Sequence, residues 1–299
     1  MDTLKTLTYE VTGRIARITL NRPERGNGIT FDTPAELSEC VERANLDPSV
    51  HVIALAGNGN GFCGGYDLVL TAEQKPGEDG GTPRWPTGSV MDPKVQLANH
   101  DPESTWDPTL DYAMMSRNVR GFMSLFYSDK PVICKVHGFC IAGGTDMALC
   151  SDLLVIEENA SIGYPPARAW GVPTTAMWAY RIGPEKAKRL LFTGDCLTGK
   201  QAVEWGLATE AVATGKLDQH FESLLERVAR VPVNQLVMMK LMINQTLLAQ
   251  GLQSAQLLGT LFDGVARHTR EGYAFQKRAA EVGFKQAVKE RDEPFGDAK

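Results

Sequence analysis

Short runs of β-branched and aliphatic residues alternate with segments of helical pattern over most of the chain, from Val11 to about Val212. Each apolar run is bounded by Gly, Asn, Asp or Pro, which is typical of strand ends. The predicted strands are Ile15–Leu20, Val50–Ala56, Val132–Val136 and Leu153–Ile156. This alternation predicts a mixed α/β core in which helices pack on a sheet.

The first long helix has a predicted start with three signals. Thr33 occupies the expected N-cap, Pro34 follows at the first helical position, and Glu36 is placed to complete a capping box with Thr33. Apolar residues then recur at helical spacing, which predicts that one face is buried. These residues are Leu37, Cys40, Val41 and Ala44.

Beyond about Lys216 the strand pattern gives way to successive predicted helices. They are Leu236–Leu248, Leu252–Phe262 and Tyr273–Val288. A stripe of Met238, Leu241, Met242 and Gln245 is more typical of a core or a subunit interface than of a cofactor site. We therefore expect an α/β core over residues 1–215 and a helical oligomerisation region over residues 216–299.

Residues 71–112 form an insertion rich in Gly, Pro and Asp. Loops of this length are usually either functional lids or solvated segments. Trp85, His100 and Trp106 favour an ordered lid, and a solvated insertion is the alternative.

Composition excludes several classes of function. The chain has 31 Lys plus Arg against 36 Asp plus Glu, a net charge of −5, and no basic cluster, so we expect no nucleic-acid partner. A local basic pocket for a small anion remains compatible with this sum.

Apolar runs fall short of the ~18 residues that span a bilayer, and the start lacks a signal pattern, so we expect a cytoplasmic protein without membrane association. The six cysteines show no CxxC pair and are expected to be buried, reduced thiols.

Common cofactor and nucleophile motifs are incomplete. Residues 59–64 satisfy GxGxxG, but Pro76 and a glycine run interrupt the helix that a dinucleotide site requires. Residues 194–200 resemble a P-loop, but Gln201 stands where Ser or Thr would bind magnesium. The histidines lack ligand spacing and there is no GxSxG, so we expect neither a metal nor a serine nucleophile.

Two glycine-rich loops each follow a predicted strand and lead toward a helix. They are residues 61–68 (GFCGGYDL) and residues 137–146 (HGFCIAGGTD). Such a transition leaves backbone N–H groups unpaired, and these can bind a developing negative charge. If the two loops meet, they would form an oxyanion hole.

Six motifs occur in the order and spacing of one known family. They are Leu20–Pro23 (LNRP), Phe62–Leu68 (FCGGYDL), Lys130–Gly144 (KPVICKVHGFCIAGG), Cys150–Leu153 (CSDL), Leu191–Gly194 (LFTG) and Gly206 with Leu207. The chain resembles the crotonase, or enoyl-CoA hydratase/isomerase, superfamily over nearly its whole length. The resemblance implies a crotonase-type, ClpP-like spiral of strand-strand-helix units with a C-terminal helical trimerisation region.

The resemblance also implies the chemistry. The substrate would be an acyl-CoA thioester, with coenzyme A as part of the substrate and no further cofactor, and the assembly a homotrimer or a dimer of trimers. The backbone N–H groups of Tyr66 and Gly143 would bind the thioester oxygen. Gly64, Asp67 and Leu68 of the first loop would line the substrate site.

The family's hydratases use two glutamates, and only one has a counterpart here. Asp146 occupies the first position, where a structural role as an acid at a helix N-terminus is the alternative. Pro166, or Ala167 on a shifted alignment, occupies the second, and neither can transfer a proton. Tyr164 and Arg168 are the nearest replacements in sequence. The insertion offers others, namely His100, Asp101, Glu103, Asp107 and Asp111.

Cations for the phosphates of CoA are also implied by the resemblance. Arg25, just after LNRP, fits the family's basic position, with Glu24 beside it as a departure from the pattern. Lys289 or Arg291 would supply the C-terminal cation, and a solvated helix end is the alternative. The leading hypothesis is an enoyl-CoA hydratase or isomerase that stabilises a thioester enolate. The alternatives are an acyl-CoA hydrolase or decarboxylase of the same fold, and a non-catalytic acyl-CoA-binding protein.

Overall fold

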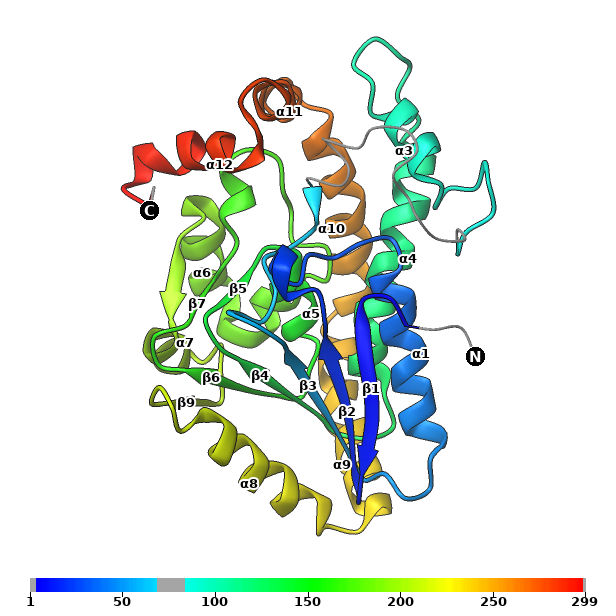
Figure 1. The fold of residues 1–299 in the computed structure, drawn as a ribbon, viewed down its shortest axis with the longest axis vertical. Helices are drawn as coiled ribbons and strands as arrows, with labels where there is room; N and C mark the ends of the chain where they lie inside the picture. Colours follow the sequence, from blue (N-terminus) through cyan, green and yellow to red (C-terminus); the bar gives the residue numbers. More distant parts are fainter. Residues whose placement is uncertain (1–3, 69–83, 298–299) are drawn as a thin grey trace.

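Six strands form the central sheet of the computed structural model, which describes residues 4–68 and 84–297 (Figure 1). From one edge to the other they are β1 (Leu7–Thr12), β2 (Ile15–Leu20), β3 (Val52–Gly57), β4 (Val132–Val136), β6 (Leu153–Glu157) and β9 (Glu210–Val212). Only β1 runs antiparallel to its neighbour, and the other pairs are parallel. The α/β core predicted from the sequence is therefore confirmed.

A second, three-stranded sheet lies beyond the carboxyl ends of β4 and β6. It contains β5 (Phe139–Ile141), β7 (Ser161–Gly163) and β8 (Cys196–Thr198), with β5 and β7 parallel. Strand β5 follows β4 after two residues, and β7 follows β6 after three. The chain thus passes from the large sheet to the small one after β4 and again after β6, which is a repeated unit of the kind a spiral contains.

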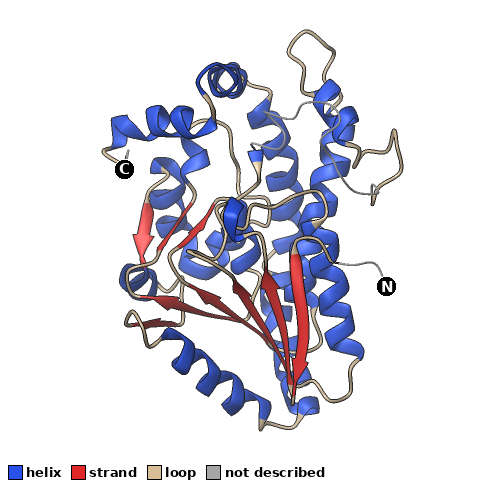
Figure 2. Cartoon of the chain, in the orientation of Figure 1, coloured by secondary structure: helices blue, strands red, loops and turns tan. Residues whose placement is uncertain are grey.

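Helices cover both faces of the large sheet (Figure 2). In chain order, the helices of four or more residues in the described ranges are α1 (Thr33–Leu46), α3 (Pro93–Asn99), α4 (Pro108–Tyr127), α5 (Gly143–Ala148), η2 (Pro165–Arg168), α6 (Met177–Thr193), α7 (Gly199–Trp205), α8 (Leu217–Ala229), α9 (Val233–Ala249), α10 (Leu252–Arg267), α11 (Arg270–Val282) and α12 (Phe284–Asp292). Short 3-10 turns occupy η1 (Pro23–Arg25) and η3 (Glu293–Phe295). Within the described part of the chain no helix is long and apolar enough to cross a membrane.

Successive side chains along the central strands point to opposite faces of the sheet. On β3, Ile53 and Leu55 pack into the main core with α1 and α4, whereas Val52 and Ala54 pack against α8. All four side chains are buried. Parallel strands covered on both faces read as continuous apolar runs, which is why these strands were visible in the sequence.

Helix α1 begins one residue earlier than predicted, because Asp32 and not Thr33 is the N-cap, and the predicted capping box is wrong. Glu36 lies in the interior and accepts hydrogen bonds from the backbone N–H of Lys5 and from both the N–H and the hydroxyl of Thr6. No side chain caps the helix at Asp32. The Glu36 carboxylate therefore pairs with donors near the start of the chain and not with the backbone N–H groups of its own helix.

Two further helical predictions need correction. The helix predicted over Tyr273–Val288 is broken by Gly283, whose φ of 85° is left-handed, and forms α11 and α12. Helix α10 continues to Arg267 instead of ending at Phe262. Five cysteines are buried as expected, but Cys196 is exposed, and all six are free thiols.

Part of the predicted insertion lies outside the described residues, namely 71–83. The remainder contacts the core. Trp85 donates to the carbonyl of Phe31 at 3.3 Å, Arg84 pairs with Glu39 at 3.2 Å, and Met91 is buried. The insertion therefore contacts the core at these three residues, whereas residues 86–88 and 101–105 are exposed.

Candidate active site

The two glycine-rich loops lie side by side at the carboxyl ends of β3 and β4. Ile141 donates its N–H to the carbonyl of Cys63 at 2.9 Å, and Phe62 donates to the carbonyl of Phe139 at 2.9 Å. Asn27 ties the first loop down from beneath, because its amide donates to the carbonyl oxygens of residues 58, 61 and 62. Loops at neighbouring carboxyl ends of parallel strands are the usual place for a ligand site.

Glycine is required where the loops touch. Gly65 has a φ of +101°, and a Cβ there would lie 2.9 Å from the Cβ of Ala142. A Cβ on Gly143 would lie 2.9 Å from both the Tyr66 ring and the Ile29 side chain. The close approach of the two backbones therefore depends on glycine on each side.

The backbone N–H groups of Tyr66 and Gly143 have no hydrogen-bond acceptor among residues 4–68 and 84–297. Gly143 is the first residue of α5, and Ala142 before it has an unusual φ of 54° and ψ of −125°. A non-glycine residue in that conformation is strained, and such strain is typical of functional sites. Within the described residues, the structure thus leaves two unpaired donors on adjoining loops.

Asp146 lies in the first turn of α5 and is 1% exposed. Its Oδ1 accepts from the N–H of Thr175 at 3.1 Å and from the Thr175 hydroxyl at 2.8 Å. Its Oδ2 has no partner within the described residues. Burial raises the pKa of Asp146 to about 7, while the two bonds from Thr175 oppose that increase.

Other buried polar atoms without a partner in the described chain gather near Asp146. They are the hydroxyl of Tyr66, Oδ1 of Asn118 and the hydroxyl of Thr174. Asn118 lies close enough to oppose the increase in the Tyr66 pKa that burial causes, although the two do not reach hydrogen-bonding geometry. Buried polar groups are nearly always paired, so this group of unpaired atoms marks a place where a ligand or water belongs.

We expect Asp146 to make stability depend on pH. An aspartate in the unfolded chain has a pKa near 3.8, whereas burial raises the pKa of Asp146 to about 7. Between these values the folded protein keeps a proton that the unfolded chain has released, so stability decreases as the pH rises. In urea titrations, Asp146→Asn should therefore gain about 3 kcal/mol relative to the wild type between about pH 5 and about pH 8. A constant difference across that range would contradict the raised pKa.

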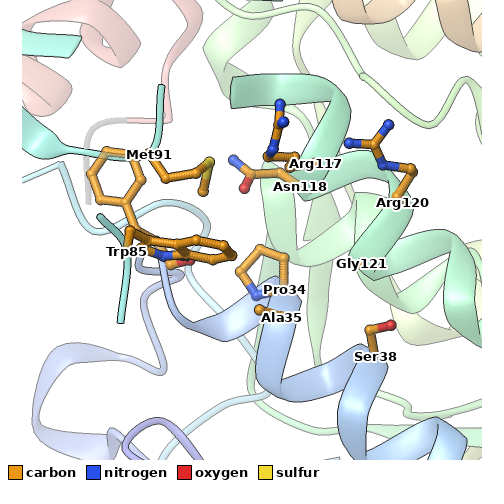
Figure 3. Close-up of a pocket in the computed structure, with 10 residues that line it drawn as sticks. Pro34, Ala35, Ser38, Trp85, Met91, Arg117, Asn118, Arg120 and Gly121 are labelled. Atoms are coloured by element: carbon orange, nitrogen blue, oxygen red, sulfur yellow. Dashed lines mark hydrogen bonds between the residues drawn. The ribbon is translucent and has the colours of Figure 1, made fainter. Parts of the chain in front are cut away.

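A cavity of about 210 Å³ opens beside Asn118, between α1, α4 and the described part of the insertion (Figure 3). Trp85 and Met91 face Pro34 across it, and Asn118 points toward it from α4, whereas Arg117 and Arg120 extend away (Figure 3). Its lining is mostly apolar. Asn118 therefore connects an apolar cavity with the Tyr66 hydroxyl.

The predicted replacements for the second glutamate are placed differently from one another. Tyr164 is buried, and burial raises the pKa of its hydroxyl well above the ordinary range. The Arg168 side chain is 2% exposed and binds three carboxylates, those of Asp195, Asp292 and Asp297. Arg168 therefore anchors the C-terminal segment to η2, and its guanidinium is committed to that role.

Of the candidates in the insertion, two point inward. Asp111 is buried and pairs with Arg267 of α10 and with His268. His100 lies 3.1 Å from His268, ring nitrogen to ring nitrogen, and burial lowers the pKa of His100 to about 4. Asp101, Glu103 and Asp107 are exposed, and Asp107 caps α4.

The predicted phosphate-binding cations have different surroundings. Arg25 pairs with Asp67 at 2.8 Å, and Arg22 binds the same buried carboxylate at 2.8 Å. Asp67 thus holds two arginines beside the first loop. Arg291 pairs with the neighbouring Asp292 at 2.7 Å, and Lys289 is exposed on α12.

Sequence reasoning missed two charged residues that the fold brings to this region. Asp263 and Arg267 lie one turn apart on α10, are paired, and are both withdrawn from solvent. The signal was present, because Asp263 and Gln256 recur at helical spacing among apolar residues. Polar residues on one face of an otherwise apolar helix indicate either an exposed face or a buried site.

Comparison with known proteins gives one consistent result. The family model described as enoyl-CoA hydratase/isomerase matches residues 10–86 and 107–285. The chain is similar to the crystal structure of an enoyl-CoA hydratase from Mycobacterium smegmatis, with 55% identity, a TM-score of 0.92, and coverage of 99% of this chain and 96% of that one. It is also similar to a 1,2-epoxyphenylacetyl-CoA isomerase of Escherichia coli, 28% identical over 239 residues, which cover 77% of this chain and 78% of the relative. A carnitinyl-CoA dehydratase of Proteus mirabilis is 27% identical over 221 residues, or 73% and 72% of the two chains.

Proposed function

The chain belongs to the enoyl-CoA hydratase/isomerase family, and we propose that it adds water to, or moves, the double bond of an enoyl-CoA thioester. The family membership makes it an enzyme of the hydratase/isomerase kind with the crotonase-type fold and an acyl-CoA thioester substrate. The observation that carries the specific proposal is the pair of unpaired N–H groups of Tyr66 and Gly143, next to a buried carboxylate.

The two amides would bind the thioester oxygen. When a proton leaves or joins C2, or water adds at C3, negative charge develops on that oxygen as an enolate. Donors already fixed in place in a site that excludes water stabilise such a charge without reorganisation. The chemistry therefore needs no metal and no redox cofactor in this proposal, because backbone amides and a carboxylate supply it.

Asp146 would exchange the proton at the reacting carbons. Its Oδ1 is fixed by Thr175, so Oδ2 is the oxygen available to substrate. A general acid or base works best when its pKa lies near the operating pH, and burial raises the pKa of Asp146 to about 7. A purely structural acid at a helix N-terminus would gain nothing from an unpaired, buried oxygen.

The apolar cavity beside Asn118 would hold the acyl substituent. Trp85 and Met91 would close its outer side, which gives the described part of the insertion a role in substrate selection. Arg25 would contribute to binding the CoA phosphates at the edge of the first loop, with its guanidinium held in place by Asp67.

A panel of 2-enoyl- and 3-enoyl-CoA esters tests this function. Hydration removes the ultraviolet absorbance of the conjugated enoyl thioester, and migration of a 3-enoyl double bond creates it. Either change would support the proposal. Release of free thiol would indicate hydrolysis instead, and binding without turnover of any ester would indicate a binding protein.

We also propose that copies of this chain associate through α9 and α10, which make up much of the helical region after residue 215. Helix α10 buries polar residues such as Gln256, Thr260 and Asp263 and exposes apolar ones. The exposed large apolar side chains of the two helices are Met238, Met239, Leu241, Met242, Ile243, Leu257, Leu258, Leu261, Phe262 and Val265. The Met and Leu stripe is therefore outside this chain's core, and two neighbouring helices that expose large apolar side chains fit association with a second copy.

We expect the protein to be a trimer or a dimer of trimers, and we expect glutamate on this face to dissociate it. Met242→Glu with Leu258→Glu places charges where apolar contact is proposed, so light scattering after gel filtration should show a monomer. Phe192→Glu is the matched control, because Phe192 is an exposed apolar residue on α6 (81%) outside the face. A wild-type monomer, or the same dissociation with the control, would contradict this proposal.

A further inference from the structure

The family's second carboxylate position is occupied here by Pro166 or Ala167, so a reaction that needs two proton-transfer groups lacks one of them. Resting on the proposed function, we propose that Asp263 of α10 is the second carboxylate of the catalytic centre. It would act with Asp146 from the opposite end of the segment Val172–Thr175.

Helix α10 runs along that segment and fixes the position of Asp263. Gln256 donates its amide to the carbonyl of Thr175 at 3.1 Å, and one turn later Gly259 packs on Pro173, where a Cβ would lie 2.8 Å from the carbonyl oxygen. One turn further, Oδ1 of Asp263 accepts the N–H of Val172 at 3.4 Å. Residues spaced by three or four share one face of a helix, so a single face of α10 contacts the segment along its length.

The same segment holds Asp146 at its other end, through Thr175. Three peptide units separate Val172 from Thr175, so their Cα atoms are at most about 11 Å apart. The hydroxyl of Thr174 between them is buried and has no partner among the described residues. Two carboxylates and an unpaired hydroxyl thus line one short stretch of backbone, where a water molecule would be bound.

The electrostatic interactions of Asp263 and Asp146 also indicate that the two carboxylates are near each other. The negative charge of Asp263 raises the pKa of Asp146, and both carboxylates raise the pKa of Tyr66 and of Tyr164. Tyr66 carries one of the proposed oxyanion donors. Asp263 therefore acts on the same residues as Asp146, although 117 positions separate the two in the chain (263 − 146).

A buried cation keeps Asp263 in place. Its Oδ2 accepts from Arg267 one turn along α10, and Arg267 also binds Asp111 of α4. Gly264 lets α10 approach Asp111, since a Cβ there would lie 3.0 Å from the Asp111 carboxylate. Burial raises the pKa of Asp263, and the Arg267 guanidinium opposes that increase and so favours the ionised carboxylate. Arg267 also keeps a partner in Asp111 when Asp263 is neutralised.

This pairing assigns the two roles in hydration. Ionised Asp263 takes a proton from water as the water oxygen bonds to C3, and the C2–C3 π electrons move toward the thioester oxygen. Protonated Asp146 gives its proton to C2 as the enolate collapses. Return of one proton from Asp263 to Asp146 completes the cycle, and the net change is the addition of one water molecule.

Asp263→Asn tests the assignment, since the amide oxygen can still accept from Val172 and Arg267 keeps Asp111. We expect kcat to fall at least about 100-fold, as loss of a general base does, with KM and the affinity for a saturated acyl-CoA changed less than about threefold. Asp152→Asn is the matched control. Asp152 also accepts a backbone N–H, from Val132 at 2.7 Å, and pairs with a buried cation, Lys240, at 2.8 Å.

A second measurement separates catalysis from a structural role. The carboxyl carbon resonance of Asp146, assigned by its absence in Asp146→Asn, reports the pKa of that group. Asp263→Asn should lower this pKa because a neighbouring negative charge is removed, while Asp152→Asn should leave it unchanged. Asp263→Glu keeps the charge and should retain the raised pKa of Asp146 and part of the activity.

The outcomes distinguish this inference from the proposed function. Activity of the wild type with full activity of Asp263→Asn overturns the role of Asp263 and leaves the function standing. An unchanged pKa of Asp146 in Asp263→Asn also overturns the pairing, whether or not a substrate is found. Equal loss of activity in Asp152→Asn would show a structural effect and overturn it, and a wild type inactive on every ester overturns both proposals.

Discussion

Asp146→Asn should lower kcat for hydration or double-bond migration by about 100- to 10,000-fold, the range that a general acid or base contributes. The substitution keeps the size of the side chain. It also keeps the hydrogen bonds from Thr175, because an amide oxygen accepts from the same N–H and hydroxyl. What it removes is the exchangeable proton on the unpaired Oδ2. The measurement is kcat and KM on the best ester of the panel, beside calorimetric binding of a saturated acyl-CoA.

Binding should be nearly unchanged, since the proposed contacts with the thioester oxygen are backbone groups. Asp146→Glu is the matched variant, because it restores a titrating carboxylate with one more methylene and should recover part of the lost rate. If Asp146→Asn kept more than about a tenth of the wild-type kcat, Asp146 would be a structural residue after all. The proton would then have to pass through another group, and Asp263 would lose its proposed partner.

The strands that the sequence located correctly are those buried on both faces. β2 and β4 have the predicted bounds. Each is an apolar-rich run that pairs with a parallel neighbour and is bounded by turn-forming residues. β3 begins at Val52 and not at Val50, since His51 donates its N–H to the carbonyl of Arg14 before the ladder starts. The apolar run begins two residues before the strand does, because pairing with the neighbouring strand, and not apolar character, determines where β3 begins.

The errors arose where a distant residue outcompetes a local one. Glu36 had the spacing of a capping box, but the buried N–H groups of Lys5 and Thr6 bind its carboxylate. Local spacing cannot reveal a partner 30 residues away. The error at Gly283 has a local cause. The glycine was visible in the sequence, but the periodic apolar pattern suggested that the helix continues, whereas the left-handed φ of Gly283 ends α11.

For the candidate site, predictability follows the same division. The two glycine-rich loops and Asp146 lie within short motifs after strands, so the sequence placed them without knowledge of the fold. Asp263 reaches the same segment only because α10 crosses back over it, and no motif near residue 263 records that packing. The inverted character of α10, polar inside and apolar outside, is the physical signal that would have singled it out.

Replacing the N–H of Tyr66 by an ester oxygen should lower kcat by about 100- to 1,000-fold, the loss that follows removal of one oxyanion donor. Side-chain substitution cannot make this test, since any amino acid except proline keeps the N–H, and truncating Tyr66 would open a cavity against Gly143. Incorporation of the α-hydroxy analogue of tyrosine at position 66 changes one atom and preserves the ring. The N–H of Tyr66 has no acceptor in the described chain, so no structural hydrogen bond is lost with it.

The same hydroxy acid at Tyr127 is the matched control. Tyr127 ends α4 and is about half exposed, so its ester removes a helical hydrogen bond worth about 1 kcal/mol of stability but no group near the loops. We expect the control to reduce the melting temperature and leave kcat intact, and the ester at position 66 to do the reverse. Should both esters behave alike, the thioester oxygen is not bound at Tyr66, and Gly143 alone would have to stabilise the enolate. A site with a single donor would not require two glycine-dependent loops to lie side by side.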